Sequence, residues 1–285
     1  MNAVYQLAHN IKLKAAYGEY LQYIVSINTQ EYELSQFLDT YYPLEHHLPS
    51  ASRQSILGME VDVTPGIQLS LDCYYKDILR TYAYDYNASQ LEATSFFEKL
   101  RQGQGESYGL ELLAKGYWGK TSGWISYGWS KSTRQFPHIM NGKLYLFDYD
   151  RPHSFKAMLN HQVNPALEFS GSLQILSGMP KTLETSFASY YYYDPVTNQI
   201  GVWPHVVTPV KNNIRMPYYL RLDLGMKKRL RKGFGADHAF LNVTFGNLLF
   251  AVQRNVWFYI HEKDKLYGVG TNYIPEFGVG YSIQF

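Results

Sequence analysis

The segment "YDRPH" (149–153) carries residue types that can perform acid–base chemistry. It places Asp150, Arg151 and His153 close together in sequence, and a carboxylate with a histidine is the usual content of a proton-transfer site. The chain has no serine or cysteine in a recognisable nucleophile elbow, and sequence spacing does not show that side chains converge. We therefore expect no catalytic residues. We interpret the three side chains as groups that pair with neighbouring strands where a loop enters a strand.

Two other segments could contact a ligand. Four consecutive tyrosines could stack on a sugar or chelate ring, and two adjacent histidines could touch a metal. Adjacent residues of a strand point to opposite faces, so one metal would need an unusual backbone at the histidines. The pattern favours loop aromatics that pack on one another and solvated histidines, and we expect no metal site and no cofactor. The ligand candidates are Tyr190, Tyr191, Tyr192, Tyr193, His46 and His47.

Composition excludes several classes of protein. The formal net charge is only +2, so binding to nucleic acid is not expected, and the basic "KKRLRKG" (227–233) is interpreted as a solvated turn. Aromatic residues make up 16% of the chain, with 27 tyrosines, while charged residues are 18%, below the roughly 25% of soluble domains. The single cysteine, Cys73, cannot form an internal disulfide.

Alternation of apolar and polar residues is the dominant pattern along the chain. Residues 67–75 are an example, because Ile67, Leu69, Leu71, Cys73 and Tyr75 alternate with polar or tyrosine residues. Such segments have one apolar and one polar face. The pattern predicts ten strands, near residues 10–25, 54–64, 66–76, 105–118, 121–133, 153–163, 166–177, 217–231, 238–260 and 274–285.

The connections between these strands fall into two alternating classes. Short, turn-rich links lie at 64–66, 119–121, 163–165 and 232–237. Long polar segments lie at 26–53, 77–104, 134–152, 178–216 and 261–273. The alternation places all short turns at one end of the strands and all long loops at the other. Short periplasmic turns and long extracellular loops are typical of outer-membrane β-barrels.

Two further features bear on the membrane. No stretch approaches the roughly 20 apolar residues of a membrane helix, and the mean hydropathy is −0.30. A transmembrane barrel carries apolar residues at every second position and so leaves a weak hydropathy signal. The N-terminal "MNAVYQLAHN" shows no signal peptide. We therefore expect either a cytosolic protein or the later part of a longer one.

The residues also resemble a known family, the TonB-dependent outer-membrane receptors in their Bacteroidetes-like form. The similar stretches follow one another in family order and cover most of the chain. They are "LGMEVDVTPGIQLSLDCYYKD" (57–77), "GESYGLELLAKGYWGKTSGWISYGWSKS" (105–132), "YDRPHSF" (149–155), "LEFSGSLQILSGMP" (167–180), "RMPYYLRLDLGMKKRL" (215–230) and "IPEFGVGYSIQF" (274–285).

This resemblance implies a fold and a set of partners. The family's barrel has 22 strands and is preceded by a plug domain and a segment that contacts TonB; the ten predicted strands would be its last ten. Residues 1–285 would then be the C-terminal barrel portion without plug or signal peptide, and TonB would be reached only through the missing N-terminal part. Phe277, Tyr281 and Phe285 resemble the family's C-terminal signal for the barrel-assembly machinery.

We therefore predict an all-β, antiparallel transmembrane barrel in the outer membrane of a Gram-negative bacterium, in contact with lipid. It would take up a siderophore, cobalamin, oligosaccharide or peptide and would not be an enzyme. Lumen-facing charges could pair across strands. They are Glu111, Lys156, Glu168, Arg221 and Asp223.

Two alternatives stay open from the sequence. A stand-alone ten-stranded outer-membrane barrel, a hydrolase or a pore, is one, since ten strands could close alone; the hydrolase would need carboxylates and a histidine converging at the loop end. A soluble β-sandwich or propeller-like binding module is the other, and it would fractionate with the cytosol.

Overall fold

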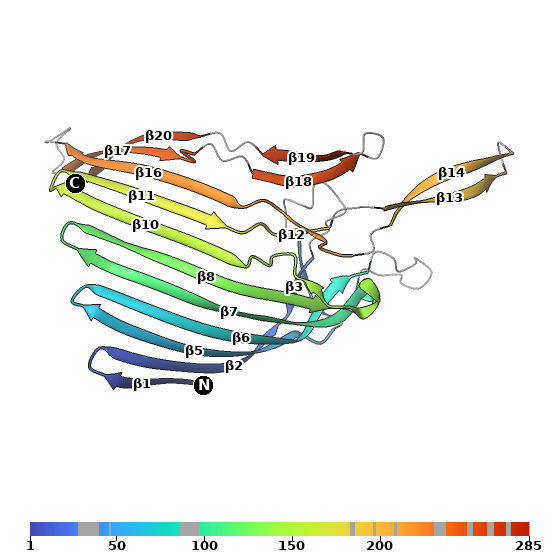
Figure 1. The fold of residues 1–285 in the computed structure, drawn as a ribbon, viewed down its shortest axis with the longest axis horizontal. Helices are drawn as coiled ribbons and strands as arrows, with labels where there is room; N and C mark the ends of the chain where they lie inside the picture. Colours follow the sequence, from blue (N-terminus) through green and yellow to red (C-terminus); the bar gives the residue numbers. More distant parts are fainter. Residues whose placement is uncertain are drawn as a thin grey trace.

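An antiparallel sheet accounts for most of the molecule (Figure 1). The computed structural model describes residues 1–27, 40–45, 47–85, 97–182, 186–195, 198–207, 210–230, 238–249, 253–260, 265–271 and 275–284. Eleven strands follow one another across the sheet in chain order, and a twelfth, β9 (Tyr145–Leu146), pairs with β8 beside this path. The eleven are β1 (Asn2–Ala8), β2 (Ile11–Gln22), β5 (Ser50–Thr64), β6 (Ile67–Tyr84), β7 (Leu100–Trp118), β8 (Thr121–Gln135), β10 (His153–Asn164), β11 (Leu167–Leu176), β16 (Tyr219–Leu230), β17 (His238–Gly246) and β20 (Glu276–Gln284).

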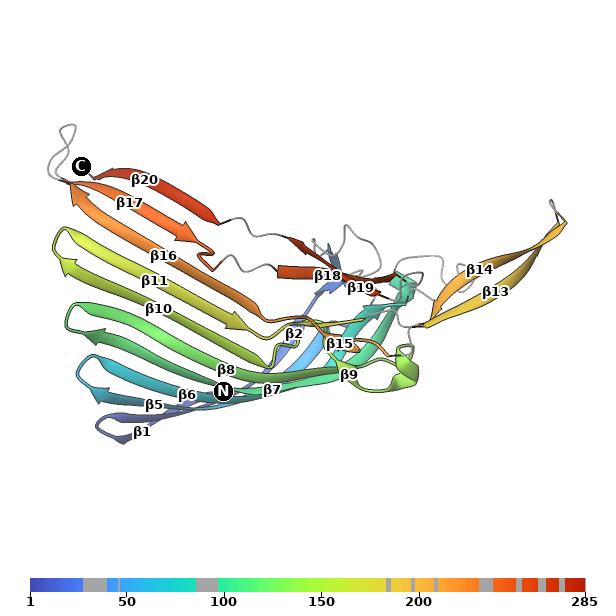
Figure 2. The same ribbon diagram turned by 45° about the horizontal axis from the view of Figure 1, so that its top comes forward.

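The connections sort by length, as the sequence predicts. Short turns join β1 to β2, β5 to β6, β7 to β8 and β10 to β11, and all lie at one end of the sheet, here called the turn end (Figures 1 and 2). Gly66 makes the turn after β5 with φ +100, and the ring of Tyr117 lies directly over it, where a Cβ would clash. The long connections, such as those from β2 to β5 and from β11 to β16, lie at the opposite, loop end.

Smaller paired elements lie within these long connections. They are the hairpins β3 (Ile24–Ile27) with β4 (Thr40–Pro43), β13 (Ser186–Asp194) with β14 (Gln199–Val207), and β18 (Gln253–Ile260) with β19 (Lys265–Thr271); the two-residue pair β12 (Pro180–Lys181) with β15 (Ile214–Arg215); and the 3-10 turns η1 (Phe97–Lys99) and η2 (Met140–Gly142). The hairpin β13–β14 extends away from the sheet (Figures 1 and 2). None of the described helical segments is long or apolar enough to cross a membrane.

Strand register brings like residues side by side across the sheet. On one face, Met59 lies opposite Leu71, Leu71 opposite Leu112, Leu112 opposite Tyr127, and Tyr127 opposite Phe155. We call this the apolar face. The next residues along the same strands make the polar face, on which Glu111 lies opposite Asp72. The faces differ because successive strand residues point to opposite sides.

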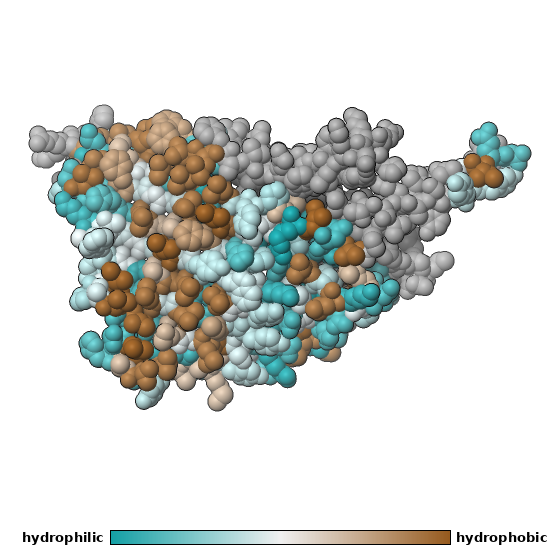
Figure 3. Space-filling model, in the orientation of Figure 1, coloured by the Kyte–Doolittle hydropathy of each residue, from teal (hydrophilic) through white to brown (hydrophobic). Residues whose placement is uncertain are grey.

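The apolar face is exposed rather than covered. Leu57 is 67% exposed and Leu112 45%, and apolar side chains spread over the strands of the sheet in Figure 3. A cluster of buried apolar side chains lies at the loop end instead, around Val25, Leu44, Tyr82 and Leu100. Soluble monomers rarely leave so continuous an apolar surface in contact with water. The predicted all-β, antiparallel fold with one apolar and one polar face is confirmed.

Two strand predictions need correction. The predicted strand at 238–260 is wrong, because β17 ends at Gly246 and, within the described residues, β18 pairs with β19 in a separate sheet. Asn247, with φ +50, turns the chain out of the sheet, and its N–H donates to Asp223 Oδ1 at 2.8 Å.

The strand β1 was missed in the sequence, so the main sheet has eleven strands in sequence where ten were predicted. Its edges are β1 and β20.

Candidate functional site

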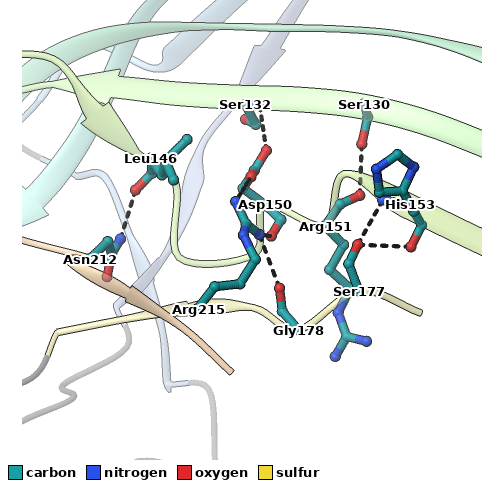
Figure 4. Close-up of polar contacts among 10 residues, drawn as sticks. All are labelled: Ser130, Ser132, Leu146, Asp150, Arg151, His153, Ser177, Gly178, Asn212 and Arg215. Carbon is teal, nitrogen blue, oxygen red and sulfur yellow. Dashed lines mark hydrogen bonds and ion pairs between the residues drawn. The ribbon is translucent and has the colours of Figure 1, made fainter. Parts of the chain in front are cut away.

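A buried ion pair at the loop end ties together four segments of the chain. Asp150 is 2% exposed, and its Oδ2 lies 2.7 Å from Nη2 of Arg215 on β15. Asp150 Oδ1 accepts the backbone N–H of Ser132 on β8 at 2.7 Å. Arg215 Nη1 donates to the carbonyl oxygens of Asp150 and Gly178, at 2.8 and 3.0 Å (Figure 4). We call these four residues the Asp150 clamp.

The other residues of "YDRPH" turn to different partners. The backbone N–H of His153 donates to Ser177 Oγ at 2.6 Å, and His153 Nδ1 lies 2.8 Å from Tyr127 Oη on the apolar face. The Arg151 carbonyl accepts a hydrogen bond from Ser130 Oγ at 3.1 Å (Figure 4). Asp150 and His153 therefore serve separate structural contacts. The interpretation that this segment pairs with neighbouring strands is borne out.

A second polar group lies next to the clamp, and we call it the Asp148 cluster. Asn212 Nδ2 donates to the Leu146 carbonyl at 2.6 Å (Figure 4). It also donates to Asp148 Oδ1 at 2.7 Å. Lys211 Nζ lies 3.7 Å from Asp148 Oδ1 and 5.5 Å from the ring centre of Tyr145. The guanidinium of Arg134 covers the ring of Phe147 at 3.9 Å. The cluster consists of Arg134, Tyr145, Asp148, Lys181, Lys211 and Asn212.

Two basic side chains near these groups, Lys181 and His138, are partly buried. Burial lowers the pKa of the Lys181 ammonium, and Asp148 opposes this shift. Burial likewise lowers the pKa of His138, whose ring packs edge-on against Phe136 at 5.8 Å. Both ring nitrogens of His138 are buried, and Asp85 and the backbone of Tyr84 oppose the lowering of its pKa. The loop end therefore holds several basic groups that burial disfavours in their charged form.

The tyrosines and histidines predicted as ligand contacts lie outside these two groups. Tyr190, Tyr191, Tyr192 and Tyr193 all belong to β13. The side chains of Tyr191 and Tyr193 point to the face opposite that of Tyr192, so these three rings do not form one stack. Tyr191 and Tyr193 are 73% and 60% exposed. The ring of Tyr192 lies over Gly201 on β14. Whether these tyrosines bind a ligand stays a prediction.

The predicted histidine pair is only partly described. His47 stacks at a tilt against Tyr82, with ring centres 5.2 Å apart, and His46 lies outside the described residues. No group of three or more potential metal ligands occurs in the parts of the chain that the structure describes.

The C-terminal strand β20 has the alternation predicted for it. Phe277 packs beside Phe245 with ring centres 5.0 Å apart, and Tyr281 lies opposite Leu241 on the apolar face. Phe285 lies outside the described residues. A role for Phe277, Tyr281 and Phe285 in recognition by the assembly machinery stays a prediction.

Charged residues of the polar face make fewer ion pairs than their number suggests. Arg221 lies 2.9 Å from Asp223 and 3.4 Å from Glu276 on β20. Glu168 is opposite Lys227 in register, whereas Glu111 is opposite Asp72 and Lys156 opposite Gln174. All five predicted lumen residues share the polar face, yet only Arg221 and Asp223 among them form an ion pair within the described structure.

Comparisons with known proteins place this fold. No family model matches the chain, and no curated protein sequence matches it. Among solved structures, the ferric-catecholate import receptor Fiu of Escherichia coli K12 superimposes with a TM-score of 0.58 at 12% identity, over 100% of this chain and 34% of that one. The chain has the fold of part of an outer-membrane receptor barrel.

Two further outer-membrane receptors have structures similar to this chain. BauA, the ferric preacinetobactin receptor of Acinetobacter baumannii, gives a TM-score of 0.57 at 13% identity over 100% of this chain and 36% of that one. The ferripyoverdine receptor of Pseudomonas aeruginosa gives 0.54 at 10% identity over 90% and 29%. These are TonB-dependent outer-membrane receptors, so the predicted resemblance is confirmed in fold. The chain spans about a third of their length.

Sequence reasoning missed both the Asp150 clamp and the Asp148 cluster as assemblies. Asp150 and Arg215 are 65 positions apart, and Asp148 and Asn212 are 64 apart. These four residues lie in the long connections between strands of the main sheet, where no periodicity aligns them with a partner. The "YDRPH" segment was the one local signal, and it pointed to Asp150 without its ion-pair partner.

Proposed function

We propose that this chain is part of the barrel of a TonB-dependent receptor that imports a scarce ligand across the outer membrane of a Gram-negative bacterium. The single observation that carries the proposal is the exposed apolar face, continuous in register across the sheet and backed by a polar face. Lipid would contact the apolar face, and the polar face would line the lumen. A soluble sandwich would have to cover that apolar face.

The direction of the edge strands supports a barrel larger than this sheet. Every neighbouring pair along the eleven-strand path is antiparallel, so β1 and β20 run in the same direction. A barrel that is antiparallel throughout therefore needs an odd number of further strands between them. A 22-stranded barrel would supply eleven. The alternative of a ten-stranded barrel that closes alone loses support, because the sheet has eleven strands in sequence.

The remaining roles follow from this assignment. The loop end would face the exterior and contact the ligand, which could be a ferric siderophore, a cobalamin, an oligosaccharide or a peptide. TonB would act through a plug domain that is separate from this barrel portion, and the barrel-assembly machinery would read the β20 end. No enzymatic activity is proposed, because Asp150 and His153, the groups considered for catalysis, serve separate contacts.

Membrane fractionation followed by uptake tests this proposal. The gene that carries the chain would be tagged in its own bacterium, and the outer membrane, inner membrane and cytosol would be probed for the product. A deletion strain and its complemented counterpart would then be compared for growth on limiting iron, cobalamin or glycan, with and without TonB. We expect the product in the outer membrane and a TonB-dependent growth defect on one nutrient. A product in the cytosol would refute the proposal.

A further inference from the structure

The Asp148 cluster lies at the root of the protruding hairpin β13–β14. One arm of the hairpin leaves the sheet region through Lys181 and Thr182, and the other returns through Lys211 and Asn212. The backbone N–H of Asn212 donates to Thr182 Oγ1 at 3.0 Å, which joins the two arms. Asn212 also holds Asp148, so both arms are fixed to the segment after β9. The two lysines therefore flank the root of the hairpin, one on each arm.

The charges at this root do not balance among the described residues. Arg134, Lys181 and Lys211 contribute three positive charges, and Asp148 contributes one negative charge. Asp150 is already neutralised by Arg215 within the clamp. Lys181 is partly buried and is attracted by Asp148, but its ammonium makes no hydrogen bond or close ion pair within the described parts of the chain. A partly buried cation without a partner is costly, because desolvation disfavours its charge.

The polar groups around the root also favour a ligand of negative charge. Both hydrogens of the Asn212 side-chain amide are used, on the Leu146 carbonyl and on Asp148. Arg134 Nη1 donates to Ser132 Oγ at 3.1 Å and to the Thr133 carbonyl at 2.8 Å, and the guanidinium stays in place on Phe147. The Lys211 ammonium makes a 3.7 Å ion pair with Asp148 and lies over the Tyr145 ring, which leaves it room for a further acceptor. A ligand that approaches here meets donors and positive charge.

We propose that the root of hairpin β13–β14 is an anion-binding subsite, in which Lys181 and Lys211 together grip a carboxylate or phosphate group of the imported ligand. The inference rests on the proposed function and specifies the chemistry of the ligand. An anion held by both lysines would tie the two arms of the hairpin to each other. Binding would therefore reduce the mobility of the hairpin that carries the exposed tyrosines.

Binding of simple anions to the purified receptor tests this subsite. The full-length receptor in detergent would be titrated with citrate and with inorganic phosphate, and sucrose would serve as the uncharged probe. Lys181→Gln and Lys211→Gln remove one charge each, and Lys143→Gln, an exposed lysine at the same end, is the matched control. We expect citrate to bind wild type and the control equally, and at least about tenfold more weakly to either cluster variant.

Cleavage of the hairpin gives a second readout. Citrate should slow chymotryptic cleavage at Tyr191–Tyr193 in wild type and Lys143→Gln but not in Lys181→Gln. Equal binding by all four proteins, or no binding of either anion, would overturn the subsite. Those results would leave the fractionation and uptake tests unaffected, so failure of the subsite is distinguishable from failure of the receptor assignment. Unchanged mobility of each variant on unheated gels would show that the barrel is intact.

Discussion

At the scale of single residues, the Asp150 clamp shows how burial determines the contribution of an ion pair to stability. The Asp150 carboxylate is almost wholly buried, and its two oxygens are held by Arg215 Nη2 and by the backbone N–H of Ser132. Replacing Arg215 with Met leaves a buried, unpaired carboxylate, so we expect a loss of about 3–5 kcal/mol in the free energy of unfolding. Urea unfolding of the receptor in detergent would measure it.

The control for this prediction is an exposed arginine ion pair on the main sheet, between β2 and β5. Arg53 and Glu19 are 2.9 Å apart, but their side chains are 51% and 63% exposed. Arg53→Met should therefore cost no more than about 1 kcal/mol. Similar losses for Arg53→Met and Arg215→Met would show that the clamp is not buried in solution.

The histidine at the loop end should make stability depend on pH. Burial lowers the pKa of His138 below its ordinary value of about 6.5; Asp85 opposes this shift, and Arg101 and Lys211 add to it. Between the two pKa values the unfolded chain binds a proton and the folded chain does not. The contribution of His138 to the free energy of unfolding is therefore fully present above about pH 6.5. It is lost as the pH falls through the lower pKa of the folded state.

Hydrogen exchange of residues 136–142 at pH 8 and pH 5 would measure this effect. After correction for the intrinsic exchange rate at each pH, we expect lower protection at pH 5 than at pH 8 in wild type. The difference should be smaller in His138→Phe, which keeps the contact with Phe136 but cannot titrate. His161→Phe, at an exposed position on β10, should behave as wild type. An identical pH response in His138→Phe would exclude His138 as the source.

At the scale of elements, alternation in the sequence was enough to predict ten of the eleven strands and both faces of the sheet. The prediction failed where alternation continues through a turn, because Phe245 and Trp257 both belong to apolar runs. The strand ends at Asn247 because of its positive φ and its hydrogen bond to Asp223, which is distant in sequence. The prediction also failed at β1, where Val4 occupies a polar-face position opposite Lys14. Long-range pairing, which builds the clamp and the cluster, leaves no period in the sequence.

The two faces of β7 predict opposite outcomes for neighbouring substitutions. Leu112 lies on the apolar face between Leu71 and Tyr127, and Glu111 lies on the polar face. Lysine facing the middle of a bilayer costs about 2–4 kcal/mol, so Leu112→Lys should sharply lower the yield of folded receptor in the outer membrane. Glu111→Lys should leave it nearly unchanged. Folded yield is read from the unheated band on gels, and equal yields would contradict contact of this face with lipid.

At the scale of the whole molecule, the parallel direction of β1 and β20 is the property that limits how the sheet can close. No single segment of sequence contains it, since it depends on the number of strands between the two edges. One strand missed in the sequence reverses the conclusion: ten strands could close in antiparallel fashion, and eleven cannot. This is why correcting the strand count changes the inferred architecture as well as the topology.

Engineered disulfides would test which strands meet at the edges. In a Cys73→Ser background, Val243→Cys with Val279→Cys joins residues directly opposite on β17 and β20 and should cross-link readily. Ala3→Cys or Tyr5→Cys on β1, each with Val279→Cys on β20, should not cross-link in the assembled receptor, because further strands separate the two edges. Efficient cross-linking of β1 to β20 would mean that the eleven strands close on themselves by a parallel pairing. The eleven strands would then form a small closed barrel, and the proposed relation to the 22-stranded architecture would fail.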